Sequence, residues 1–251
     1  MREWGEGKSL LIHCSLSHGG TLARLAEALA GGARAFDLPG HGNGPAWDGG
    51  DYQAQAVAMA RAASPMPGPV FGHSFGGTVA LRFAVENPDL VTSLTLVEPV
   101  FFAALRLHDS EAYRAHTAAF SAIADCLHAR NFHEAAELFT TMWGGAPWRL
   151  MPQRFKDGLA AQMPLISAQH VGIDEDSGGV FAPGKLEALE IPVTLIRGGQ
   201  SEPSVAAIHR VLLSLLPAAR EHVIEEAGHM VPMTHAAEVA ALMGTDERLA
   251  P

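Results

Sequence analysis

The five residues 72–76 carry the clearest chemical pattern in the sequence. They read Gly-His-Ser-Phe-Gly, which places Ser74 in a G-x-S-x-G arrangement. An apolar pair, Val70 and Phe71, precedes the pattern, and a helix-like segment, 78–86, follows it. On a sharp strand-to-helix turn, a side chain two residues before or after the serine would clash, and glycine removes that clash. The pattern therefore predicts that Ser74 is a nucleophile held on such a turn.

A serine hydroxyl needs a base within hydrogen-bond reach, and histidine is the usual one because its pKa lies near neutral pH. The chain has 13 histidines, so position must select among them. His229 follows the last predicted strand, on a loop bounded by Gly228 and Pro232. Because the sites of open α/β sheets assemble at the carboxyl ends of strands, we expect His229 to be the base that serves Ser74.

The elements that must position these residues alternate between short apolar runs and helical patterns, which is typical of a parallel sheet with crossover helices. Strands are predicted at 10–12, 33–36, 70–71, 94–97, 193–196 and 223–224, and helices at 21–30, 51–63, 78–86, 205–216 and 235–243. From Phe101 to about Gly184 no convincing strand is found, and helices are predicted at 108–129, 132–142 and 152–168. We expect an α/β core of residues 1–99 and 185–251 with a helical cap inserted at 100–184. A separate interaction domain is the alternative interpretation of that insertion.

Four motifs, taken together and in order, make the sequence resemble the α/β-hydrolase superfamily over essentially its full length. They are His13-Cys14-Ser15-Leu16, the segment 37–42, the serine motif extended to Gly77, and the segment 228–232. The resemblance implies a mostly parallel central sheet flanked by helices, and catalytic residues in the order serine, acid, histidine. The sequence departs from the family pattern at Cys14, which replaces the usual glycine, and in its nearly absent strands before that segment.

The resemblance leaves two candidates, Glu98 and Glu202, for the acid that orients the histidine. Glu202 follows the strand before the histidine, where most of the superfamily carries aspartate, but a typical Gly-x-x-Asp spacing would put the acid at Ser201. Glu98 ends the predicted strand 94–97, and members resembling haloalkane dehalogenases place their acid there. The Glu98-Pro99 junction also restricts the backbone as the chain leaves for the cap. The sequence favours Glu98 and keeps Glu202 as the alternative.

Further residues are assigned to the oxyanion and to the substrate. The resemblance implies that the backbone N–H of Phe75 is one oxyanion donor and that Ser15 or Leu16 supplies the other. Asp37 and His41 are expected to hold the loop beneath the site. In the cap, the aromatic residues predicted to line the substrate pocket are Trp143, Trp148 and Phe139.

Net charge, the N-terminal residues and missing motifs argue against several classes of partner and cofactor. A net charge of −10 without a basic run argues against a nucleic acid partner. The N-terminal residues do not read as a signal peptide or a membrane span, so we expect a cytoplasmic protein with no membrane partner. Cys14 and Cys126 are expected to be free thiols, with Cys14 a packed small side chain. His133-Glu134 lacks the second histidine of H-E-x-x-H, and no phosphate or dinucleotide loop occurs, so we expect no metal and no cofactor.

These patterns predict a carboxylesterase-like serine hydrolase that cleaves a small, fairly apolar ester, thioester or lactone through an acyl-enzyme on Ser74. Two alternatives stay open. One is carbon–carbon bond hydrolysis or cofactor-free haloperoxidase activity on the same fold, and the other is a hydrolase-like ligand-binding protein without turnover. The expected partner is a small-molecule substrate, and the oligomeric state is left open, a homodimer included.

Overall fold

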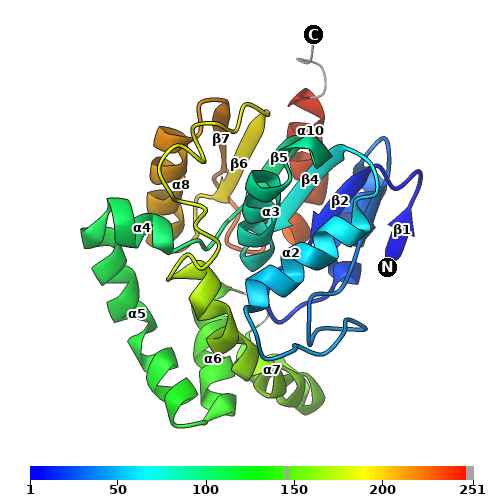
Figure 1. The fold of residues 1–251 in the computed structure, drawn as a ribbon. Coiled ribbons are helices and arrows are strands. Elements are labelled where there is room, and N and C mark those ends of the chain that lie inside the picture. Colours follow the sequence, from blue (N-terminus) through cyan, green and yellow to red (C-terminus); the bar gives the residue numbers. More distant parts are fainter. Residues whose placement is uncertain (145–146, 247–251) are drawn as a thin grey trace.

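A central β-sheet with helices on both faces forms the body of the protein, and a further group of helices lies at one end of it (Figure 1). The computed structural model describes residues 1–144 and 147–246. The sheet in this part of the chain has seven strands in the order β1-β3-β2-β4-β5-β6-β7. They are β1 (Arg2–Trp4), β2 (Ser9–Ile12), β3 (Ala33–Ala35), β4 (Gly68–His73), β5 (Val91–Val97), β6 (Val193–Gly198) and β7 (Ala219–Ile224).

All pairings in the sheet are parallel except that of the edge strand β1, which runs antiparallel to β3. The mostly parallel sheet predicted from the sequence is therefore confirmed. Its register places Gly72 of β4 beside Leu96 of β5, and Leu96 beside Leu195 of β6. As a result, the carboxyl ends of β4, β5 and β6 meet at one edge of the sheet, where the chain delivers Ser74 and Glu98.

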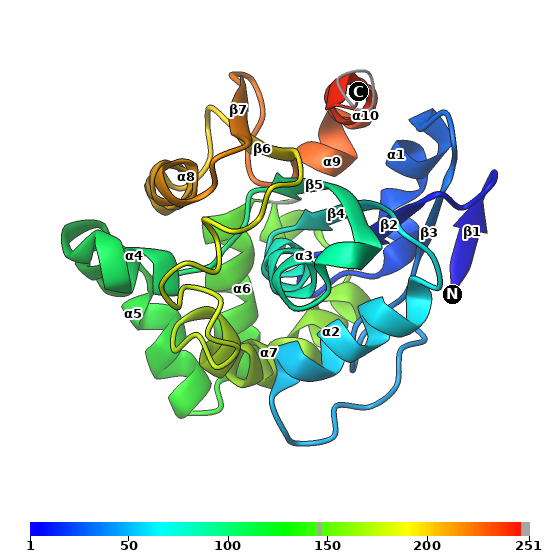
Figure 2. The same ribbon diagram turned by 45° about the horizontal axis from the view of Figure 1, so that its top comes forward.

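Side chains of the strands alternate between two apolar cores, as the two-residue period of a strand requires. In β2, Leu10 and Ile12 join the core that contains residues of α2, α3 and α8, whereas Leu11 joins the core that contains residues of α1 and α10. Figure 2 shows α2 and α3 on one side of the sheet and α1 and α10 on the other. The helices around the sheet are α1 (Ala23–Ala28), α2 (Tyr52–Ala63), α3 (Phe75–Glu86), α8 (Pro203–Leu215), α9 (Val231–Thr234) and α10 (Ala236–Asp246).

In the described residues between β5 and β6, in the segment predicted to form a cap, there are four α-helices, and we call them the cap helices. They are α4 (Ala103–His108), α5 (Ser110–His128), α6 (Phe132–Trp143) and α7 (Gln153–Ile173). An apolar cluster that includes Ile123, Ala135 and Met163 joins α5, α6 and α7. Helix α7 also packs against α2, which connects this group to the sheet. None of the helices in the described part of the chain combines the length and the hydropathy needed to span a bilayer.

The structure differs from the sequence prediction at strand β7, at helix α4 and at strand β1. Strand β7 begins at Ala219, four residues before the predicted start. The prediction began too late because the first half of the strand contains polar side chains such as Glu221, which binds Arg197 and His209. Helix α4 was not predicted as a separate element. It ends at His108, and the side chain of Asp109 then accepts a hydrogen bond from the Ala112 N–H and caps a new helix, α5. The short edge strand β1 was also missed.

Candidate active site

Ser74 occupies the turn between β4 and α3. Its backbone has φ 56° and ψ −120°, a conformation that residues with a side chain rarely adopt. The Ser74 N–H donates to the Val97 carbonyl oxygen on the neighbouring strand β5 at 2.9 Å, which fixes the turn against the sheet. The hydroxyl is thereby held at the carboxyl edge of the sheet, in a residue that is 7% exposed.

The two glycines of the motif are needed because the backbone approaches itself closely. A Cβ on Gly72 would lie 2.2 Å from the Gly76 carbonyl oxygen, and a Cβ on Gly76 would lie 2.3 Å from the Ile12 carbonyl oxygen. Both distances are far inside van der Waals contact with backbone atoms. An alanine at either position would therefore displace the turn that holds Ser74.

His229 lies between β7 and α9 and hydrogen-bonds on both sides. Its Nε2 is 2.9 Å from the Ser74 Oγ, and its Nδ1 is 2.9 Å from the Glu98 Oε2. Because a carboxylate only accepts hydrogen bonds, Nδ1 carries the proton of a neutral imidazole and Nε2 accepts from the serine hydroxyl. This arrangement gives Ser74 an acceptor for its proton and gives the resulting imidazolium a carboxylate partner.

Glu98 is fully buried directly after β5, with φ 53°. Its second carboxylate oxygen, Oε1, accepts hydrogen bonds from the Gly198 N–H at 2.6 Å and from the Ser201 hydroxyl at 2.7 Å. Burial by itself raises the pKa of the Glu98 carboxyl, but the hydrogen bonds from His229, Ser201 and Gly198 outweigh it and hold this pKa below its ordinary value. The carboxylate therefore stays ionised beside His229.

The structure separates the two acid candidates. The carboxylate that contacts His229 is that of Glu98, whereas Glu202 is the half-buried N-cap residue of α8. Ser201 occupies the position where a Gly-x-x-Asp spacing would place the acid, and its hydroxyl donates to Glu98. In this chain the carboxylate beside His229 therefore lies at the end of β5, and the hydroxyl of Ser201 hydrogen-bonds it from the loop after β6.

His73 was not singled out in the sequence, yet it holds the loop of His229. It is fully buried, and burial lowers its pKa to about 3, so that it is neutral. Its Nε2 lies 2.8 Å from the His229 carbonyl oxygen and donates to it, and the two rings are 5.2 Å apart. In a single sequence, the variable position of G-x-S-x-G offers no signal for this contact.

The candidate oxyanion donors differ in how they are used. The Leu16 N–H donates to the Nε2 of His41 at 3.0 Å, so this donor is already engaged. Ser15 lines the same cavity as Ser74, and its hydroxyl donates to Gln169. The Phe75 N–H opens helix α3 and is one of the donors that a helix leaves without an internal acceptor. Phe75 and Ser15 therefore fit a pair of oxyanion donors better than Leu16 does.

Asp37, His41 and Cys14 make contacts of a structural kind. Asp37 accepts from the Gly19 and Asn43 N–H groups, each at 2.8 Å, and forms an ion pair with Arg2. Burial raises the pKa of Asp37, but the hydrogen bonds and the charge of Arg2 outweigh it and lower this pKa to about 2. Burial raises the pKa of the Cys14 thiol to about 11, which keeps the thiol protonated and unreactive at neutral pH.

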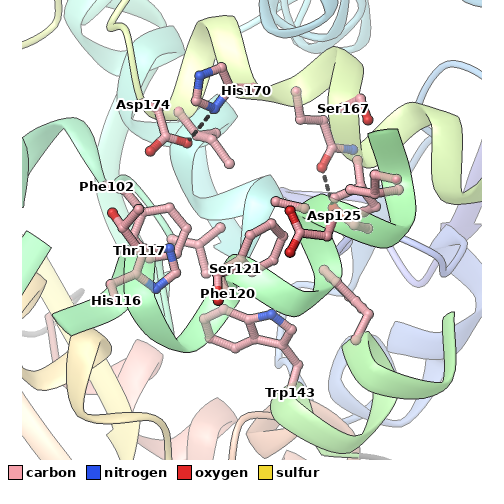
Figure 3. A pocket seen from close by; sticks show the side chains of 18 of the residues that line it. Phe102, His116, Thr117, Phe120, Ser121, Asp125, Trp143, Ser167, His170 and Asp174 are labelled. Carbon is pink, nitrogen blue, oxygen red and sulfur yellow. Dashed lines mark hydrogen bonds and ion pairs between the residues drawn. The ribbon is translucent and has the colours of Figure 1, made fainter. Parts of the chain in front are cut away.

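A cavity of about 560 Å³ lies between Ser74 and the cap helices (Figure 3). Ser15, Ser74 and Val100 line it from the sheet side, and Phe139 and Trp143 line it from α6. The Trp143 ring lies 4.8 Å from the His229 ring and so shields the imidazole from one side. The structure thus places two of the three predicted aromatic residues, Phe139 and Trp143, in the wall of this cavity.

Trp148, also predicted to line the pocket, lies elsewhere. It starts the 3-10 helix η3 (Trp148–Leu150), after the chain has left α6 at Gly144 with φ 76°. There it lines a separate polar depression, and the ammonium group of Lys156 lies 5.4 Å from its ring centroid. The two tryptophans therefore lie at different sites.

Comparisons with known proteins agree with the fold of the chain. The model of the alpha/beta hydrolase family matches residues 10–242. A pimeloyl-[acyl-carrier protein] methyl ester esterase of Neisseria meningitidis is 32% identical over 219 residues, which are 83% of this chain and 80% of that protein. A protein of the same name from Methylococcus capsulatus is 28% identical over 246 residues, covering 93% of this chain and 92% of its own.

Solved structures share the fold at lower identity. A hydrolase from Pseudomonas aeruginosa superposes with a TM-score of 0.73 at 18% identity, over 98% of this chain and 92% of that one. An esterase from Exiguobacterium antarcticum superposes with a TM-score of 0.72 at 16% identity, over 97% of this chain and 93% of that one.

Proposed function

Because this chain belongs to the alpha/beta hydrolase family and is a hydrolase, we propose that it cleaves a small, fairly apolar ester, thioester or lactone with Ser74 as nucleophile. The observation that carries the proposal is the continuous set of hydrogen bonds from Ser74 through His229 to Glu98. Each contact has the length and the donor direction that base-assisted attack by a hydroxyl requires.

In the proposed reaction, the Ser74 oxygen attacks the carbonyl carbon of the ester while the Nε2 of His229 takes the hydroxyl proton. The bond from carbon to the leaving oxygen then breaks, and His229 returns the proton to that oxygen. In the second half, water attacks the carbonyl carbon of the acyl-serine and gives a proton to His229. The bond from that carbon to the serine oxygen then breaks, His229 returns the proton to this oxygen, and the acid is released. Glu98 stays ionised throughout and stabilises the imidazolium formed in each half.

The backbone N–H groups of Phe75 and Ser15 are the proposed donors to the oxyanion. Backbone donors fixed before reaction stabilise the developing negative charge without reorganising, and loss of one such donor typically costs about 10²- to 10³-fold in rate. Phe75 is held at the start of α3, and Ser15 is tied to α7 through its hydroxyl bond to Gln169. These anchors support their use as a preorganised pair.

The substrate class rests on the cavity and on the relatives. The cavity volume of about 560 Å³ lies within the range of small-molecule sites. The cavity is lined by apolar side chains such as Val100 and Trp143. The relatives from Neisseria meningitidis and Methylococcus capsulatus are named as methyl ester esterases. We therefore propose a carboxylic ester with a small alcohol group as the preferred form of the substrate.

The test is turnover of p-nitrophenyl esters of graded acyl length, and of the matching methyl esters, by the wild type and by Ser74→Ala. We expect hydrolysis by the wild type and a loss of at least about 10⁴-fold in Ser74→Ala, with melting temperatures compared to verify folding. If the folded wild type hydrolyses none of these esters, the proposal is wrong, and a ligand-binding role without turnover becomes the better account.

A further inference from the structure

One histidine in the wall of the Ser74 cavity has no role in the proposed reaction. His116 lies on α5, is 8% exposed, and lines the cavity. Its ring lies against that of Phe102 (Figure 3). The two rings are stacked, with centroids 3.6 Å apart and planes 14° apart. The Trp143 ring, which contacts His229, lies 6.5 Å from the His116 ring. His116 is therefore placed one aromatic ring beyond the reacting centre.

The imidazole of His116 is held in place by stacking rather than by hydrogen bonds. In the described part of the chain, its buried Nδ1 has no hydrogen-bond partner. Buried polar atoms are nearly always paired, so an imidazole that makes no hydrogen bond with the described residues, in a residue that lines the cavity, keeps unused hydrogen-bonding capacity beside it. Burial lowers the pKa of His116 to about 4, so the ring is neutral at pH 7 and offers one donor and one acceptor.

The carboxylates that line the cavity are those of Asp125 and Asp174, and His128 and His170 line it as well. Among its described lining residues there is no lysine or arginine. Asp174 accepts from the Tyr113 hydroxyl at 3.3 Å and contacts the Nδ1 of His170 at 3.1 Å, so its carboxylate is stabilised in the wall. The guanidinium of Arg106 binds the carbonyl oxygen of Asp174 rather than its carboxylate. A second carboxylate, brought in by a substrate, would therefore meet like charge.

We propose that His116 is a specificity residue that hydrogen-bonds an uncharged hydroxyl group carried by the acyl part of the substrate beyond the scissile ester. The apolar part of the substrate chain between the scissile ester and this group then packs against Val100, Phe102 and Trp143. A terminal carboxylate is disfavoured because Asp125 and Asp174 face the same space. This inference rests on the proposed function and specifies the class of ester that the site prefers.

The test compares three series of methyl esters of straight-chain acids, which end in a methyl, a hydroxyl or a carboxylate group, at chain lengths from four to ten carbons. Hydrolysis is followed by acid release at constant pH. For the wild type we expect one chain length at which kcat/KM for the hydroxyl ester exceeds that of the methyl-ended ester by about three- to tenfold, the range expected of one neutral hydrogen bond. The carboxylate series is expected to be the poorest at every length.

Three variants separate hydrogen bonding from shape. His116→Phe keeps a flat ring on Phe102 and is expected to abolish the hydroxyl preference. His116→Gln keeps one donor and one acceptor and is expected to retain part of it. The matched control is His133→Phe, since His133 lies on α6 in the separate polar depression and is expected to leave the preference unchanged.

The inference is overturned if no chain length shows a hydroxyl preference in the wild type, if His116→Phe keeps the preference, or if carboxylate esters are the best substrates. Failure of the proposed function looks different, because then no ester of any series is hydrolysed. Equilibrium binding of the same esters to Ser74→Ala, measured by calorimetry, reports the preference without turnover. Equal affinity for the hydroxyl and methyl series would overturn the inference there too.

Discussion

Replacing Glu98 with glutamine would change one charge and almost no volume, and the surroundings of Glu98 determine what the new amide does. The Oε1 position receives two donors, the Gly198 N–H and the Ser201 hydroxyl. The amide oxygen of the introduced glutamine must face these donors, because an NH₂ group there would leave both unpaired. The NH₂ group then points to the Nδ1 of His229 and donates to it.

This reversal has a direct consequence for His229. An imidazole that accepts at Nδ1 carries its proton on Nε2, and it can no longer take a proton from Ser74. The imidazolium also loses its carboxylate partner. A wrong tautomer of this kind lowers kcat by about 10⁴ in a well-studied serine protease, so we expect a loss of about 10³- to 10⁴-fold, or about 4 to 5 kcal/mol of transition-state stabilisation.

The assay is steady-state hydrolysis of p-nitrophenyl butyrate by the wild type, Glu98→Gln and Glu202→Gln. Glu202→Gln is the matched control, since Glu202 stands at the start of α8 without a capping hydrogen bond from its side chain, and the carboxylate that reaches His229 is that of Glu98. We expect its kcat to stay within about threefold of the wild type, as for most surface changes. If folded Glu98→Gln keeps more than a tenth of the activity, or if Glu202→Gln falls as far, the assignment of Glu98 is refuted.

Three further predictions follow from the contacts of the site. The double variant Glu98→Ser/Ser201→Asp moves the carboxylate to position 201 and the hydroxyl to position 98. It should have a kcat about 10- to 100-fold above that of Glu98→Ser alone, because a carboxylate is again available to His229, and an unchanged kcat would contradict the described geometry. Trp143→Ala should lower kcat/KM for ester hydrolysis by about tenfold or more, and it should lower the free energy of unfolding, measured with urea, by about 3 to 5 kcal/mol. Trp148→Ala should change kcat/KM by less than about twofold, and equal effects of the two variants on kcat/KM would show that the substrate pocket is assigned incorrectly. Burial lowers the pKa of three histidines to about 3 or 4, from an ordinary 6.5; they are His13, His73 and His116. The unfolded chain therefore binds more protons than the folded chain below pH 6.5, so stability should be full above that pH and fall as the pH drops toward 4, with about two to three protons taken up by these histidines on unfolding at pH 5; a free energy of unfolding that does not change between pH 7 and pH 5 would contradict this.

The places of Ser74 and His229 in the fold could be predicted from the sequence because each lies in a setting with a clear local pattern. The turn at Ser74 needs glycines at two fixed positions, and both are visible in the sequence. His229 follows a strand, and strand ends of a parallel sheet converge. For both residues, a short stretch of chain contains nearly all the information that places the side chain.

The acid could not be settled in this way, because the distinction between Glu98 and Glu202 is tertiary. Each glutamate follows a strand, but only the pairing of β5 with β6 brings the Gly198 N–H and the Ser201 hydroxyl to the first of them. The two tryptophans present the same difficulty. Trp143 and Trp148 are the same type of residue in neighbouring stretches of the sequence, and only the folded structure shows that Trp143 lines the Ser74 cavity whereas Trp148 lines the separate polar depression.

The central claim is that Ser74 is an activated nucleophile, and labelling by a fluorophosphonate tests it most directly. The probe reacts with a serine hydroxyl whose proton can be withdrawn, and peptide mass spectrometry locates the adduct. We predict one adduct per chain, on the peptide that contains Ser74, no adduct in Ser74→Ala, and labelling slowed by about 10³-fold or more in Glu98→Gln. A folded wild-type protein that remains unlabelled, or an adduct that persists in Ser74→Ala, would contradict the account.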